Sequence, residues 1–181
     1  MMQAQKSLMY EVILDVRGLD IKSVKNQNGV DVNHYISTPK PALGSALHMQ
    51  LDIPMNRDEL RNFTIEYETI KEEQTATSWL KPEQTAGGKQ AYMFTQCESV
   101  HCRSVAPLQD TPAIKSTYTV TTRTPQAYNT FVSGKQISAD TDTKTKVTVF
   151  EMTIPVESYL LAIASGPVSY THLTLPTIPL V

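Results

Sequence analysis

Apolar and polar residues alternate with a period of two along much of the chain. The alternating runs are "LHMQLDI", "NFTIEYETI", "IKSTYTVTT" and "KVTVFEMTI". Their apolar faces carry Leu47, Met49, Leu51 and Ile53; Phe63, Ile65 and Tyr67; Ile114, Tyr118 and Val120; and Val147 and Val149, before the phase shifts after Phe150. This period is typical of strands with one buried and one solvated face.

Turn signals separate these runs, and amphipathic helical patterns are absent. Asn28-Gly29 predicts a tight turn because both residue types tolerate positive φ. The two prolines of "STPKPALG" exclude a central strand there, and "SADTDTKTK", residues 138–146, reads as a polar loop between two strands. We therefore expect an all-β fold, a largely antiparallel β-sandwich or open sheet.

Composition narrows the class of protein. The chain has 181 residues and a formal charge of −2, so we expect no nucleic-acid partner. It has no apolar run of about 18 residues, and its N-terminus does not resemble a signal peptide, so we expect no membrane partner. Two cysteines make no disulfide framework, which favours a cytoplasmic location.

The stretch "MFTQCESVHCRS", residues 93–104, holds both cysteines and one histidine. Cys97, His101 and Cys102 suggest zinc ligands, but structural zinc sites usually bring two pairs of ligands. On a strand, Cys97 and His101 would share a face and Cys102 would point away. The same geometry argues against a cysteine–histidine dyad, so we expect buried free cysteines. Glu98 lies between two apolar runs, at a strand end or paired.

Residues 75–120 resemble the N-terminal domain of the M1 family of zinc aminopeptidases, in its leukotriene A-4 hydrolase-like branch. The matching motifs are "WLKPEQT" from Trp79, Gln96-Cys97, His101-Cys102-Arg103 and "QDTP" from Gln109. The resemblance extends over roughly residues 11–166. It implies a β-saddle domain that packs on a separate catalytic domain. It also implies that zinc is held there by H-E-x-x-H and a distant glutamate, and that zinc-activated water removes N-terminal residues from peptides.

The catalytic motifs of that family are absent from this sequence. Its histidines are His34, His48, His101 and His172, and no H-E-x-x-H or G-x-M-E-N occurs. The resemblance therefore implies no cofactor in this chain, zinc in the parent enzyme, and no activity of the chain alone. Its partners would be the missing catalytic domain and the N-terminus of a peptide substrate.

One part of the family's site carries over. In the family, a strand of the saddle lines the cleft: one polar residue contacts substrate, and another helps to hold the free α-amine. The matching positions are Gln96 and Glu98, with Ser99 beside them. Glutamate at position 98 is similar to general aminopeptidases of the family rather than to the hydrolase itself. His101, Cys102 and Arg103 are expected to be structural.

Both ends of the chain depart from the family pattern, and we expect truncation at both. Residues 1–167 are predicted to be a partial saddle domain. The "SYTHLTLPT" segment within residues 168–181 is similar to a translated adapter peptide, so this tail is predicted to be non-native. The alternatives are a divergent C-terminal strand for the tail and, for the whole chain, a non-enzymatic β-sandwich binding module that acts alone.

Overall fold

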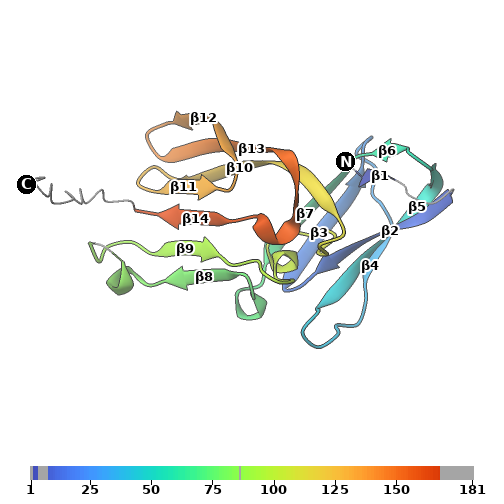
Figure 1. Cartoon of the computed structure of the whole chain (residues 1–181), viewed down its shortest axis with the longest axis horizontal. Helices are drawn as coiled ribbons and strands as arrows, with labels where there is room; N and C mark the ends of the chain where they lie inside the picture. Colours follow the sequence, from blue (N-terminus) through green and yellow to red (C-terminus); the bar gives the residue numbers. More distant parts are fainter. Residues whose placement is uncertain (1, 4–7, 86, 168–181) are drawn as a thin grey trace, which may run out of the picture.

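Strands form most of the described chain, which covers residues 2–3, 8–85 and 87–167 of a computed structural model (Figure 1). The strands are β1 (Met2–Gln3), β2 (Leu8–Val16), β3 (Leu19–Asn26), β4 (His34–Ile36), β5 (Ser45–Asn56), β6 (Leu60–Arg61), β7 (Phe63–Thr69), β8 (Thr77–Leu80), β9 (Tyr92–Thr95), β10 (Lys115–Pro125), β11 (Asn129–Val132), β12 (Lys135–Thr141), β13 (Thr145–Glu157) and β14 (Ile163–Gly166). The helical segments of these ranges are short 3-10 turns: η1 (Lys71–Glu73), η2 (Pro82–Gln84), η3 (Cys102–Ser104) and η4 (Ser158–Leu160). Paired strands in these ranges run antiparallel, which confirms the predicted fold class.

Strands β2 to β7 form one end of the molecule, the N-terminal lobe (Figure 1). Its main sheets have the orders β2–β5–β4 and β3–β7. Inward-pointing residues of these strands, together with Val32 between β3 and β4, form the larger core, which consists of Val12, Leu14, Val16, Leu19, Val24, Val32, Leu47, Met49 and Met55. Phe63, Ile65 and Tyr67 of β7 pack against this core, as their alternation predicts.

Strands β8 to β14 form the other end, the C-terminal lobe (Figure 1). Its sheets have the orders β11–β14–β9–β8 and β10–β13–β12. Their buried residues include Thr130, Val132, Thr148, Phe150 and Ser165. The hydroxyls of Thr130 and Ser165 lie 2.9 Å apart in a hydrogen bond, so these two buried polar groups are partnered.

Two predictions of which strand residues point into the core are wrong. Ile53 is 70% exposed, and Met55 takes the buried place, because the pairing of β2 with β5 changes register between Met9 and Glu11. In β13, Thr148 and Phe150 face inward while Val147 and Val149 are only half-buried. A threonine there can donate to the backbone, so alternation alone did not identify the inner face.

A second buried cluster lies between the lobes. This interlobe cluster consists of Ala76, Cys97 and Cys102, with Val105, Leu108, Tyr159 and Leu161 packed against it. Two backbone hydrogen bonds connect this region to the N-terminal lobe: Asp15 of β2 donates its N–H to the Leu108 carbonyl (2.8 Å), and Arg17, just after β2, donates its N–H to the Arg103 carbonyl (3.0 Å). The segment after β9 therefore connects both halves of the molecule.

A turn is present at the predicted place, but it spans Asn26 to Gly29, and of the pair Asn28-Gly29 only Gly29 has the positive φ expected of both. Gly29 has φ of 76° and donates its N–H to the Asn26 carbonyl at 2.9 Å. The tail predicted to be non-native, residues 168–181, lies outside the described residues, and so do parts of the N-terminal end. The structure leaves the predicted domain boundary at residue 167 untested.

Candidate functional site

Strand β9 ends earlier than the sequence pattern predicts. Its last ladder residue is Thr95, which pairs with Thr77 of β8. Gln96, directly after the strand, donates its N–H to the Ala76 carbonyl at 2.8 Å. The chain then turns at Glu98, so Gln96, Cys97 and Glu98 do not lie on one regular strand.

Residues 98–101 form a tight turn that ends at η3. The turn is closed by the His101 N–H, which donates to the Cys97 carbonyl at 2.9 Å. The Glu98–Ser99 peptide bond in it is cis. Glu98 and Ser99 are exposed, and Val100 and His101 are half-buried.

Cys97 and Cys102 are bonded to each other as a disulfide, so the expectation of free buried cysteines is wrong. Both residues are buried, as expected, with exposures of 1% and 0%. The error has a geometric cause: on a continuous strand the two side chains would point apart, but the turn brings their Cα atoms to 4.6 Å. The expectation that Cys97 and His101 share a strand face is wrong for the same reason.

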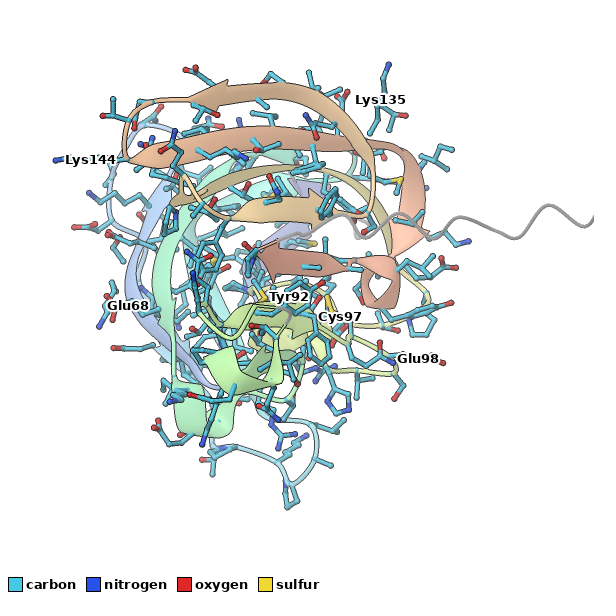
Figure 2. The ribbon with its side chains drawn as sticks, turned by 90° about the vertical axis from the view of Figure 1, so that its left-hand side faces the viewer. Glu68, Tyr92, Cys97, Glu98, Lys135 and Lys144 are labelled. Carbon is cyan, nitrogen blue, oxygen red and sulfur yellow. A yellow bond between two sulfur atoms is a disulfide. The ribbon has the colours of Figure 1, made fainter. Side chains whose placement is uncertain are left out.

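The three candidate substrate contacts, Gln96, Glu98 and Ser99, lie together on the exposed side of this segment. All three are exposed, while Cys97 between them is buried. Figure 2 shows Glu98 at the rim of the molecule, on the side opposite Glu68. Within the described ranges Glu98 makes no ion pair, so its carboxylate faces outward rather than being enclosed.

The far end of the turn is anchored by a buried charge network around Arg103, the residue after Cys102. Arg103 Nε donates to the Asp110 carboxylate at 3.1 Å, and its Nη1 lies 3.2 Å from the Asp15 carboxylate. The same guanidinium donates to the carbonyls of Leu43 (2.8 Å) and Asp110 (3.0 Å). Ser158 donates to the second Asp110 oxygen at 2.5 Å.

This network is what the sequence reading missed. Arg103 was expected to be structural, but the network also draws in Asp15, which pairs with Arg103, and Ser158, which donates to Asp110, and both come from segments far away in the chain. Asp110 has a fully buried side chain, and a buried carboxylate requires a partner. In the sequence, the position of Asp110 in the "QDTP" motif was the local indication of this buried role.

The described residues do not fit a zinc ion. The sulfurs of Cys97 and Cys102 are bonded to each other, and no group of three or more His, Cys, Asp or Glu side chains in the described ranges could hold a metal. His101 Nδ1 is buried without a hydrogen-bond partner, but it stands alone. No reaction step is therefore assigned to a metal on this chain.

A hollow of about 570 Å³ lies elsewhere, on the N-terminal lobe. Its lining includes Arg17, Ile36, Lys40, Glu72 and Glu73, and none of the candidate contacts. No helix of the described residues is long and apolar enough to cross a membrane.

Comparison with known proteins gives a consistent set of matches. Residues 2–160 match the family model described as the peptidase M1 N-terminal domain. Leucine aminopeptidase 2 of Coccidioides immitis is 37% identical over 165 residues, and leukotriene A-4 hydrolase of Xenopus laevis is 33% identical over 159 residues. These matches cover 90% and 86% of this chain but 26% of each relative, so the chain spans about a quarter of their length.

Solved structures agree with the sequence relatives. A yeast leukotriene A4 hydrolase in complex with bestatin aligns with a TM-score of 0.75 and 36% identity, over 88% of this chain and 23% of that one. An M1 zinc metallopeptidase from Deinococcus radiodurans aligns with a TM-score of 0.73 at 20% identity, over 90% of this chain and 35% of that one, which shows the shared fold. The expectation that zinc belongs to the longer relatives is confirmed.

Proposed function

Because the chain belongs to the peptidase M1 N-terminal domain family, we propose that it forms one wall of the substrate cleft of a zinc aminopeptidase similar to leukotriene A-4 hydrolase. The reaction of the whole enzyme would remove N-terminal residues from peptides. The chain spans about a quarter of its relatives, so the zinc ligands and the catalytic base would belong to a catalytic domain that this sequence does not include. The chain alone would then be inactive.

The observation that carries this proposal is the exposed cluster of Gln96, Glu98 and Ser99 beside a buried, cross-linked segment. The outward Glu98 carboxylate would accept a charge-assisted hydrogen bond from the α-ammonium of a peptide. The Gln96 amide can both donate to and accept from the peptide backbone, and Ser99 adds a hydroxyl. These residues bind and orient the substrate; they do not perform the chemical step.

The proposed partners of this chain are a catalytic domain and the N-terminus of a peptide substrate. The catalytic domain would cover the cleft side of this chain, and the N-terminus of a peptide would lie between the two. Enclosure by that domain would also exclude water from around Glu98, which strengthens an ion pair with an ammonium group. A cytoplasmic location, and the absence of nucleic-acid and membrane partners, stay predictions from composition.

The test is a chimera in which residues 8–167 replace the aligned segment of the yeast leukotriene A4 hydrolase. In that enzyme, Glu98→Ala should raise KM for a tripeptide about tenfold with kcat within about twofold, because one charged hydrogen bond to the bound substrate is lost. Glu98→Gln should give an intermediate KM, since the amide oxygen still accepts.

The matched control is Glu68→Ala, which removes an exposed carboxylate from the other side of the molecule (Figure 2). Glu68 lies 3.4 Å from the Lys22 ammonium in an exposed pair, so its loss should leave both kinetic constants unchanged. Unchanged peptide kinetics in Glu98→Ala would refute the assignment of Glu98.

A further inference from the structure

The disulfide closes a small ring around the proposed substrate contacts. Cys97 and Cys102 are five positions apart, and Glu98 and Ser99 lie between them. Two of the three proposed contacts are therefore inside the ring, and Gln96 directly precedes it.

Both ends of the ring are fixed independently of the disulfide. Before it, Gln96 donates to the Ala76 carbonyl, and Cys97 packs in the interlobe cluster. After it, the backbone N–H and the guanidinium of Arg103 both bind the Asp110 carboxylate, at 3.2 and 3.1 Å. These anchors hold the segments on either side of the turn without fixing the turn itself.

Ser104 holds the last residue of the turn, because its N–H and its hydroxyl donate to the His101 carbonyl at 3.0 and 2.9 Å. Within the described ranges, Glu98 and Ser99 make no such hydrogen bond. Within the ring formed by residues 97–102, one backbone hydrogen bond closes the turn, from the His101 N–H to the Cys97 carbonyl. Glu98 and Ser99 are exposed and pack against no core. Exposed turns of this kind open at low free-energy cost unless a covalent link restricts them.

We propose that the Cys97–Cys102 disulfide positions Glu98 and Ser99 for the substrate amine, and that its reduction by a dithiol releases them and weakens peptide binding. This inference rests on the proposed function of Glu98. In the exchange, a thiolate of the dithiol attacks one sulfur, and the Cys97–Cys102 bond breaks through a mixed disulfide. The dithiol closes its own disulfide bond, and its two protons end on the two cysteine sulfurs.

The burial of Cys97 and Cys102 favours slow, reversible reduction and oxidation of their disulfide. Both cysteines are at most 1% exposed, so a reductant reaches them only when the turn opens. In a cytoplasm, where glutathione and thioredoxins keep thiols reduced, a protein disulfide is usually transient or redox-sensing. The two thiols left after reduction would stay together in the interlobe cluster, ready to be oxidised again.

The first arm of the test uses the full 181-residue chain. Under non-reducing conditions, alkylation and mass measurement should find no free thiol, and after dithiothreitol two. Hydrogen exchange at the amides of residues 98–101 should become about tenfold faster on reduction, while amides of β13 do not change. Two free thiols before reduction, or unchanged exchange in the turn, would overturn the proposal.

The second arm measures peptide kinetics in the yeast chimera. Reduction should raise KM about threefold to tenfold with kcat nearly unchanged, and the variant with both Cys97→Ser and Cys102→Ser should show the raised KM without responding to dithiothreitol. If Glu98→Ala raises KM but reduction does not, the disulfide proposal alone fails. If Glu98→Ala has no effect either, the proposed role of Glu98 fails.

Discussion

The Arg103 side chain connects its own segment to β2 and to the loop before β5. Its guanidinium is 7% exposed and meets Asp15 of β2, the fully buried Asp110 and the Leu43 carbonyl. Burying such charges is unfavourable unless every one is partnered. The pairing therefore stabilises the contact between the lobes, and removing one member leaves an isolated buried charge.

Replacement of Arg103 by methionine should reduce the free energy of unfolding by about 3–5 kcal/mol, because Asp110 would remain buried without its cation. Urea unfolding of the full chain, followed by circular dichroism, measures this. The control is Arg57→Met, whose exposed guanidinium lies 3.8 Å from the Asp58 carboxylate and should matter by less than about 1 kcal/mol. Similar losses in the two variants would contradict a dominant role for the buried network.

At the scale of elements, β7 links its lobe to the interlobe cluster through Tyr67. The phenol of Tyr67 donates to the Val105 carbonyl at 2.9 Å. Burial raises the pKa of this phenol above 10.0. The folded chain therefore holds the phenolic proton more tightly than the unfolded chain does.

The stability that the Tyr67 phenol contributes depends on pH. Stability from this group is complete below pH of about 10 and is lost as the pH rises towards the higher pKa of the folded state. Tyr67→Phe should cost about 1 kcal/mol at neutral pH, since the Val105 carbonyl loses its donor. The variant should also lose less stability than the wild type between neutral and strongly alkaline pH. Parallel unfolding curves for the two proteins across this range would argue against it.

Strand β9 illustrates what alternation can and cannot predict. The pattern correctly places Cys97 inward and Gln96 outward. Alternation does not predict where a strand ends, because a strand ends where its cross-strand partners end. Strand β9 pairs with β14 through Met93 and Phe94, and with β8 up to Thr95. The disulfide requires the strand to end at Thr95 and the chain to turn, so it could not be predicted from the spacing of the cysteines.

At the scale of the whole molecule, the fold class was predictable and the two-lobe arrangement was not. Local alternation and turn residues are enough to indicate antiparallel strands, and the motifs from Trp79 to Pro112 were enough to indicate the family. The contact between the lobes depends on non-local pairs such as Asp15 with Leu108 and Asp15 with Arg103. A single sequence contains no direct signal for pairs that are so far apart.

The isolated chain should associate with itself. Trp79 is 59% exposed on β8, an edge strand of its sheet, and an apolar edge invites pairing with another chain. Sedimentation velocity should detect concentration-dependent oligomers that Trp79→Lys reduces. Ile154→Lys, which changes a similarly exposed residue of β13, the central strand of its sheet, should reduce them less. A monomer at all concentrations with one sharp unfolding transition would instead favour the stand-alone binding module.

The proposal that this chain forms one wall of a substrate cleft is tested most directly by asking whether it can do so in an active enzyme. The yeast chimera carrying residues 8–167 should hydrolyse an aminoacyl anilide with kcat/KM within about tenfold of the yeast enzyme. It should also still bind bestatin, which the yeast relative binds. A folded chimera, shown by an unchanged zinc content, that neither hydrolyses the substrate nor binds bestatin would contradict the assignment of this chain as a substrate-cleft domain.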